Sequence, residues 1–593
     1  MIPSPDPNAV AAIREAAGCP EIIARLLVVR QIADAQRFLN PNIDDLHSPD
    51  LILGMSAAVA RIQTAVALGE PILIYGDYDV DGTTATVLLK TAIERIASPE
   101  RPAQVTYHVP HRLREGYGIQ NVRLAEAAEA GVRLVISVDT GIRAFAAATE
   151  AKALGIDLIV TDHHLPDGVE GVPEAVAVVN PAQAGCPYPN KNLCGAGVAF
   201  KLAHALLAAH AITGVQQKRL YEAILPSFLK LVAIATIADS VDLTGENRAI
   251  VWLGLRELAN PIQPGLRALM QVAKLPLDKP PTATEVGFRI APRINAAGRM
   301  DVASEVVELF LTRDPQRADE LARKLDTLNE DRRASEAAAL EAIELQLLTL
   351  KDSGGKYPAE CLVLDHPEWH RGVIGILASR VVDRTRRPAL VLTSENGDAH
   401  GSGRSVEGYH LLDALTAVHS IGDTPLFTRF GGHAHAVGFS LPTDRLPLLR
   451  DRMRHQSSTV LTSEMLLPHI ECDLELAVSD LTMDLLQWLD RCAPFGMGNP
   501  EPVFVTRGLR LSASPRIIKE KHLSLPLAKS PDGRSLNAMG WSRNGQINWA
   551  NRSIQHQLAA GSTIDVVYRL RENRHPLYGG IELDLIDLAP SGV

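Results

Sequence analysis

Three aspartates at alternate positions, Asp77, Asp79 and Asp81, are the residues whose spacing points most directly to chemistry. They lie in the run DYDVDG, directly after the short apolar stretch 71–75. A calcium-binding EF-hand loop begins in the same way, but its twelfth residue must be a bidentate Glu and a helix must precede it. The twelfth residue here is Leu88, and the preceding stretch reads as a strand. A solvated acidic turn is the other alternative, but neighbouring carboxylates repel one another, so the pattern favours a bound cation.

Two further clusters follow apolar stretches of the same kind. Asp139 comes directly after 133–138, and Asp162-His163-His164 come directly after 157–161. Taken alone, such an Asp is most often a helix cap, and a His pair is most often surface or satisfied core. Open parallel sheets bind ligands beyond the carboxyl ends of their strands, where these residues would meet. The coincidence of three clusters therefore predicts one site.

The mixture of ligand types indicates which metal the site would take. Oxygen-rich ligands with one or two imidazoles suit Mg²⁺ or Mn²⁺ better than Zn²⁺ or copper. Several shared carboxylates favour two ions, an arrangement used for phosphoryl transfer. Asp139, which would end the central of the three ligand-bearing strands, is the best candidate to bridge both ions.

Short apolar strands alternate with helices from about residue 70, which predicts a parallel α/β sheet with helices on both faces. We expect a multi-domain α/β protein in which a long, highly charged helix joins this domain to a smaller α/β domain. Short strands separated by turn residues then predict a C-terminal β-barrel. The expected divisions are a lead-in at 1–50, a catalytic domain with a helical region at 51–313, the connecting helix at 314–350, the second α/β domain at 351–460 and the barrel at 468–593.

Length and composition limit the class of protein to which the chain can belong. A chain of 593 residues is too long for one hydrophobic core. Its six cysteines are scattered, its start does not resemble a signal peptide, and no apolar run reaches the roughly 18 residues of a membrane span. We expect a cytoplasmic protein with no membrane partner. The net charge of −10 argues against nucleic acid, yet residues 501–552 carry nine Lys/Arg and three Asp/Glu, which favours a phosphate backbone there.

Two glycine-rich runs predict a second kind of site. The run GSGRS contains Ser402 and Arg404, and its hydroxyls and guanidinium would suit a phosphate. Gly431 and Gly432, directly before His433, would let a ligand approach the backbone closely. A zinc site from His433 and His435 is the alternative, but no further ligand lies nearby in the sequence.

The motifs also resemble a known family. GDYDVDG (76–82), SVDTG (137–141), TDHH (161–164) and IADSVDL (237–243) resemble the four acidic motifs of DHH phosphoesterases. By this resemblance Asp239 is a further metal ligand, although its spacing alone reads as the end of a helix. Tyr75 departs from the family, because many members carry a metal-binding histidine there.

The likeness continues downstream in the same order. GSGRSVEGYHL (401–411) and FGGHAHAVGFS (430–440) resemble the substrate-binding DHHA1 domain. APRINAAGRMD (291–301), CAPFGMGNPEPVF (492–504) and IIKEKHLSLPL (517–527) resemble the exonuclease branch of the family, which adds a C-terminal OB-type domain. This branch degrades single-stranded DNA from its 5′ end.

The resemblance implies an exonuclease that releases mononucleotides by two-metal hydrolysis, in DNA repair and recombination. It implies one monomeric chain acting on single-stranded DNA, with a single-strand-binding protein and a helicase as partners. The metal ligands, for two Mn²⁺ or Mg²⁺, would be Asp77, Asp79, Asp81, Asp139, His163 and Asp239. Asp139, His163 and His164 would be catalytic. The substrate would contact Arg112, Arg299, Ser402, Arg404, Gly431, Gly432 and His433.

Two other functions remain open from the sequence. One is a DHH enzyme acting on short oligonucleotides, cyclic dinucleotides or pyrophosphate, which the length and the basic C-terminal region disfavour. The other is an inactive DHH scaffold that only binds DNA or replication proteins, which the full set of acidic residues disfavours.

Overall fold

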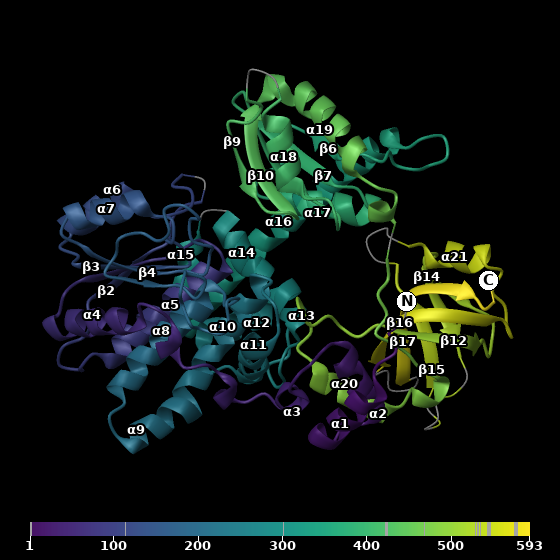
Figure 1. Cartoon of the computed structure of the whole chain (residues 1–593), viewed down its shortest axis with the longest axis horizontal. Helices are drawn as coiled ribbons and strands as arrows, with labels where there is room; N and C mark the ends of the chain where they lie inside the picture. The colour runs from purple at the N-terminus through teal and green to yellow at the C-terminus, as the bar shows by residue number, and fades with distance from the viewer. Residues whose placement is uncertain are drawn as a thin grey trace. The chain divides into compact units, whose positions relative to one another are not determined.

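A computed structural model describes residues 3–592 apart from 113, 300–301, 422–424, 468, 528, 530–532, 534, 543–546 and 574–578 (Figure 1). The chain folds into two compact units. One comprises Ser4–Asn329 and Asp484–Pro502, and the other comprises Met1–Pro3, Glu330–Met483 and Val503–Val593. The first unit is therefore discontinuous in the sequence, because a segment near residue 490 returns to it.

The first unit is built on a five-stranded parallel sheet in the order β2-β1-β3-β4-β5. Residues of the three central strands are almost entirely buried, as expected for a parallel sheet covered on both faces. This confirms the predicted α/β class. The strands are β1 (Ile72–Tyr75), β2 (Val105–His108), β3 (Leu134–Val138), β4 (Asp157–Thr161) and β5 (Ala177–Val179).

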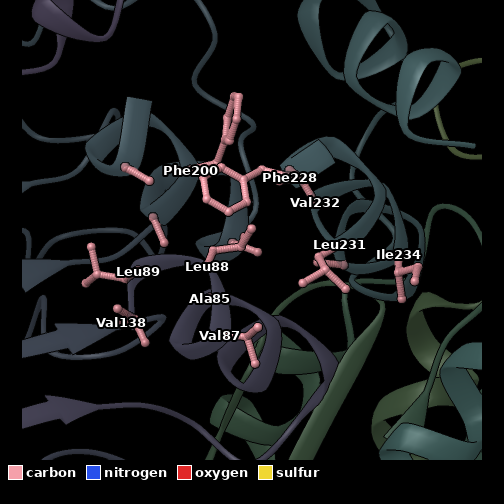
Figure 2. Close-up of a cluster of buried hydrophobic side chains, with 14 of the residues drawn as sticks. Ala85, Val87, Leu88, Leu89, Val138, Phe200, Phe228, Leu231, Val232 and Ile234 are labelled. Carbon is pink, nitrogen blue, oxygen red and sulfur yellow. The ribbon is translucent and has the colours of Figure 1, made fainter. Parts of the chain in front are cut away.

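Helices cover both faces of this sheet. On one face α5 (Val80–Ile96) packs against α8 (Gly195–His210) and α10 (Leu225–Ala238), and their apolar side chains interlock around Phe200 and Phe228 (Figure 2). Smaller helices, α6 (Asn121–Glu129) and α7 (Phe145–Ala153), contribute to the separate core on the other face. Burial on both faces fixes where each strand ends, and so where the residues after it lie.

The rest of the first unit is helical. Residues Gly214–Ala238 form one helical stretch that is long and apolar enough to cross a membrane, but 61% of its most apolar window is buried inside the fold, as in the core helix of a soluble protein. The remaining helices are α1 (Pro7–Ala17), α2 (Glu21–Val29), α3 (Ala35–Leu39), α4 (Met55–Leu68), α9 (Gly214–Arg219), α11 (Gly245–Glu257), α12 (Pro264–Val272), α13 (Ala283–Glu285), α14 (Ala291–Arg299), α15 (Ala303–Leu311) and α20 (Met483–Cys492).

One long helix, α16 (Pro315–Leu350), contributes residues to both units. It has 36 residues, close to the range that the charge pattern predicts for a connecting helix. Its C-terminal part buries Ala339, Ile343 and Leu347 in a core of the second unit.

The second unit contains a mixed five-stranded sheet in the order β6-β7-β8-β10-β9. Only the β6–β7 pair is parallel. Its strands are β6 (Leu362–Asp365), β7 (Ala389–Glu395), β8 (Asp398–Arg404), β9 (Arg429–Gly432) and β10 (Ala436–Pro442). Its helices are α17 (Ile374–Thr385), α18 (Leu411–His419) and α19 (Leu446–Val460).

A seven-stranded sheet in the order β11-β12-β16-β17-β15-β14-β13 completes the second unit. A bridge between Leu511 and Leu527 joins the end of β12 to the end of β14, so five of the strands close into a barrel. The parallel pairing of β15 with β17 and this closure are the topology of an OB fold. The elements are β11 (Leu474–Glu475), β12 (Phe504–Arg510), β13 (Arg516–Ile518), β14 (His522–Pro526), β15 (Ser535–Gly540), α21 (Trp549–Gln555), β16 (Thr563–Asn573) and β17 (Gly580–Pro590).

Candidate metal centre and substrate-binding residues

The loop after β1 brings the first three aspartates to the carboxyl edge of the sheet. Asp79 caps α5, and its carboxylate accepts a hydrogen bond from the Gly82 backbone N–H at 3.0 Å. Asp77 and Asp81 are buried. Gly82 lies very close to the backbone of Asp77, and a Cβ at Gly82 would be only 2.6 Å from the Asp77 backbone nitrogen. Gly82 is therefore required for this turn.

The N-terminus of α8 fixes the Asp81 carboxylate. The backbone N–H groups of Gly195 and Ala196 both donate to it, the second at 2.7 Å. The first turn of a helix presents N–H groups that have no partner within the helix, and here two of them bind this carboxylate. The contact of α8 with Asp81 was not predicted from the sequence. The one sequence feature that could have indicated it is the run of small residues at the start of the helix, which allows another segment to approach closely.

The ends of β3 and β4 supply the next group. Asp139 has the left-handed φ of +59°, which turns the chain directly after β3. The imidazole Nε2 of His163 lies 3.3 Å from Asp139 Oδ1, 3.8 Å from Asp81 Oδ2 and 3.9 Å from Asp239 Oδ2. Residues from four separate segments thus face one point.

Asp162 acts differently from its neighbours, because its carboxylate is used within the turn. It accepts backbone N–H groups of Ile142 and His163, at 2.9 and 2.8 Å, and lies 2.7 Å from His164 Nδ1. Burial raises the pKa of Asp162, but its bonds to His164 and the backbone outweigh burial and bring this pKa below its usual value. Asp162 therefore orients His164.

Three overlapping groups of side chains have ligand atoms close enough to share an ion. Within each group the atoms lie within 4.8 Å of one another. Asp139 belongs to two of the groups, and so does His163, which suits a pair of ions with shared ligands. The groups are Asp77, Asp79 and Asp139; Asp81, His163 and Asp239; and Asp139, His163 and His164.

The electrostatics of these groups favour bound cations. Burial, and then the neighbouring Asp79, raise the pKa of Asp77 to about 7. Burial, and then Asp81, raise the pKa of Asp239 to about 8. The Asp139 pKa is raised well above its usual value for the same reasons, and its Oδ1 is buried without a hydrogen-bond partner. Divalent cations would neutralise this crowding, so the residues present fit Mn²⁺ or Mg²⁺.

Tyr75 takes no part in these groups. Its ring is fully buried in the core on the other face of the sheet, and its hydroxyl donates to the Gly118 carbonyl at 3.2 Å. It anchors the loop that carries Tyr117, whose hydroxyl lies 3.3 Å from His164 Nδ1. Sequence reasoning missed Tyr117, because a lone tyrosine between two glycines gives no chemical signal.

Two of the predicted substrate-binding arginines lie beside the same loop. The Arg112 guanidinium lies 5.0 Å from the centre of the Tyr78 ring. Gly298 packs against the Tyr78 carbonyl, where a Cβ would lie only 2.3 Å from the oxygen, and this brings the end of α14 with Arg299 to the DYDVDG loop. The charge of Arg299 acts on the Tyr78 hydroxyl.

The other predicted substrate residues gather within the second unit. Arg404 donates to Ser402 Oγ at 3.2 Å from the end of β8, and burial lowers the Arg404 pKa. Gly432 has φ +139°, and a Cβ there would lie 2.2 Å from the Ala436 carbonyl, whereas Gly431 faces open space. Burial, His435 and Arg404 lower the pKa of His433, which indicates a shared electropositive environment.

Comparison with known families gives three matches along the chain. The DHH family N-terminal domain matches residues 71–236, the DHHA1 domain matches 357–458 and the RecJ OB domain matches 472–587. They follow one another in the order that the sequence motifs predict.

Relatives match over most of the chain. The single-stranded-DNA-specific exonuclease RecJ of Dickeya dadantii is 36% identical over 93% of this chain and 93% of its own. The Escherichia coli protein of that name is 34% identical over 91% of this chain and 92% of its own. The crystal structure of RecJ in complex with Mn²⁺ from Thermus thermophilus superposes with a TM-score of 0.79 at 28% identity, covering all of this chain and 80% of that one.

The three domains match known family domains in succession, and the relatives match over nearly the whole chain. With the identity and coverage found, the chain belongs to the RecJ family of single-stranded-DNA-specific exonucleases.

Proposed function

We propose that this protein degrades single-stranded DNA from its 5′ end to mononucleotides, in DNA repair and recombination. The observation that carries the proposal is the set of three ligand groups at one sheet edge, which are linked to one another through Asp139 and His163. Relatives named RecJ were crystallised with Mn²⁺ and with Mg²⁺, which supports the same cations here.

The proposed ligands are Asp77, Asp79, Asp81, Asp139, His163 and Asp239. Two divalent cations bound there would neutralise charge that develops on the scissile phosphate and activate a water for hydrolysis. The protein supplies the arrangement: α8 holds the Asp81 carboxylate in place, and Asp162 fixes the ring of His164. Burial lowers the pKa of the half-exposed His164, but the hydrogen bond to Asp162 outweighs burial and raises it. His164, oriented in this way, would contact a phosphate oxygen.

Substrate recognition would use both units. Arg112 and Arg299 would contact phosphates next to the metal centre. Ser402, Arg404, Gly431, Gly432 and His433 would bind the 5′ end, with Arg404 as the charged group. The OB domain would hold the rest of the strand, because Arg516, Lys519 and Lys521 are exposed on and beside β13.

Trp541 adds a stacking surface to that basic region. Its side chain is 38% exposed and its ring centre lies 5.3 Å from that of His522. We also propose that the protein acts as a cytoplasmic monomer, with a single-strand-binding protein and a helicase as partners.

A pair of end-labelled substrates tests the function. One long single strand carries its label at the 5′ end and the other at the 3′ end, and each is incubated with Mn²⁺ and with chelator. We expect early release of labelled mononucleotide only from the 5′-labelled strand, and only with Mn²⁺. Early release from the 3′-labelled strand would reverse the polarity. Equal cleavage of a dinucleotide and the long strand would favour a small-substrate enzyme.

A further inference from the structure

Asp239 reaches the metal centre in a different way from the other predicted ligands. It is the C-terminal cap of α10, whereas the other ligands lie close after the ends of β1, β3 and β4, with Asp81 in the first turn of α5. Its side chain is also the most exposed of its ligand group, at 29%. Among the described residues, its carboxylate accepts no backbone hydrogen bond of the kind that holds Asp79 and Asp81. α10 holds its backbone, since the Asp239 N–H donates to the Ala235 carbonyl at 2.8 Å, and the loop 240–243 borders it on the other side.

The segment Ala493–Pro500 lies directly against this loop. The Leu243 backbone N–H donates to the Met497 carbonyl at 2.7 Å. The glycines on either side of Met497 permit the approach. A Cβ at Gly496 would lie 2.8 Å from Leu243 Cδ1, and a Cβ at Gly498 would lie 3.0 Å from Asp242 Cβ. Gly498 also has φ +67°, which favours glycine.

This segment is itself held rigidly. The Asn499 side-chain amide donates to the carbonyls of Cys492 and Pro494, at 3.1 and 2.8 Å, and its oxygen accepts from Arg30 at 3.1 Å. Buried Arg248 donates to the Cys492 carbonyl at 2.9 Å and to the Arg491 carbonyl at 3.1 Å. A buried guanidinium without these acceptors would be costly, so α11 and this segment stabilise each other.

On its other side, the loop 240–243 is linked through Asn247 to the segment that leads into α8, the helix that binds Asp81. The Asn247 amide donates to the Asp242 carbonyl at 3.1 Å and to the Asn192 carbonyl at 2.6 Å. Three residues after Asn192, Gly195 begins α8, whose N-terminus binds the Asp81 carboxylate. Asp81 and Asp239 face the same point as His163. The loop is therefore clamped between Ala493–Pro500 and the support of Asp81.

We propose that Ala493–Pro500 is a positioning segment that holds Asp239 for one of the two cations. The proposal rests on the proposed metal centre and adds a residue range that contains no ligand. Groups that orient metal ligands typically contribute about 10–100-fold to metal affinity. Loosening this segment should therefore weaken one cation site by about that factor while leaving the contacts to DNA unchanged.

A matched pair of glycine substitutions tests the proposal. Gly498→Ala introduces a methyl group against Asp242 at a positive φ. Gly18→Ala introduces the same methyl at φ +61° in the same unit, with nothing within 4 Å. Electron paramagnetic resonance of free Mn²⁺ then measures binding to each protein without any reaction. We expect Gly498→Ala to lose affinity for one ion by about tenfold or more and Gly18→Ala to match the wild type.

Kinetics separate positioning from general damage. In Gly498→Ala the Mn²⁺ concentration for half-maximal activity should rise, while KM for single-stranded DNA stays constant and saturating Mn²⁺ restores much of kcat. Equal Mn²⁺ affinity in the two variants would overturn the proposal. If Gly498→Ala does not fold, the same binding measurement on Asn499→Asp decides the matter, because that change keeps the side-chain size but removes both amide donors. A wild type that binds Mn²⁺ yet leaves DNA intact would refute the function alone.

Discussion

Asp139 is the residue that the two proposed cation sites share. It belongs to two ligand groups, and its Oδ1 is buried without a hydrogen-bond partner. Asp139→Asn should abolish hydrolysis because one carboxylate oxygen is lost, together with the negative charge that both proposed sites would share. Asn tolerates the positive φ at this position, so the fold should survive.

The same substitution should raise stability when no metal is present. Burial, and then repulsion from Asp81, oppose ionisation of Asp139 in the folded protein, and Asn removes this cost because its amide does not ionise. The melting temperature in chelator should increase by about 2–4 °C for each kcal/mol of this cost removed. Near-normal turnover with Mn²⁺, or a lower melting temperature in chelator, would argue against the shared-ligand role.

The crowded carboxylates also set a pH dependence. The pKa of Asp77 is raised from 3.8 to about 7 and that of Asp239 from 3.8 to about 8. In chelator, their contribution to stability is fully present below the unfolded pKa and is lost as the pH rises through about 7–8. Cations compete with protons for these groups, so Mn²⁺ affinity should rise through that window.

Thermal melts with and without Mn²⁺ measure this linkage. The increase in melting temperature caused by Mn²⁺ should be larger at about pH 8.5 than at about pH 6. An increase that is equal at the two pH values would show that these carboxylates do not bind the ion.

Arg404 supports a prediction about end recognition. Arg404→Ala should raise KM for 5′-phosphorylated strands more than for 5′-hydroxyl strands, because a charge-assisted contact worth about 1.5–3 kcal/mol is lost. Arg454→Ala is the control, since Arg454 is exposed and pairs with Glu360 in the same unit. Equal changes for both substrates would place Arg404 away from the terminal phosphate.

At the scale of elements, the N-terminus of α8 is the most sharply constrained support. A Cβ at Gly195 would lie 2.5 Å from Asp139 Oδ1. Gly195→Ala should therefore displace the Asp139 carboxylate and reduce kcat by at least about tenfold, the lower end of the effect expected for groups that orient metal ligands. Gly214→Ala, at the start of α9 with open space around it, should leave kcat unchanged. Unaltered kcat in Gly195→Ala would mean that α8 does not position the ligand.

The elements that carry the ligands could be predicted from sequence because each is a local pattern. Apolar runs end at Asp77, Asp139 and Asp162, and burial of the parallel strands makes those patterns strong. Asp239 was predicted as a ligand only from the family resemblance, because an Asp at the end of a helix does not by itself indicate a metal ligand. The support from Met497 could not be predicted, because backbone contacts between distant segments leave no periodicity in the sequence. The support from Gly195 left only one signal, the small residues at the start of α8.

At the scale of the whole molecule, the division of the chain matters for truncation experiments. The sequence divides the C-terminal region at 468, whereas Asp484–Pro502 packs within the unit that holds the metal centre. A truncation that preserves this unit should therefore end after Pro502. Such a protein should fold and still cleave very short oligonucleotides.

The truncated protein should bind long single strands far more weakly, because it lacks the exposed basic residues of the OB domain. Each lost phosphate contact should reduce the salt slope by about 0.7. Measuring Kd for a long oligonucleotide across a salt series compares the two proteins. If affinity and slope are unchanged, the OB domain is structural and binds no DNA.

The discontinuity of the first unit also bears on synthesis. The ribosome releases the chain from its N-terminus, and domains generally fold as they emerge. All of the predicted ligands emerge well before Asp484–Pro502, the segment that completes their unit. The second α/β domain must be translated in between. The nascent protein therefore carries its full set of predicted ligands from Asp239 onward before the proposed support of Asp239 is made, which would delay assembly of a finished nuclease until the chain is nearly complete.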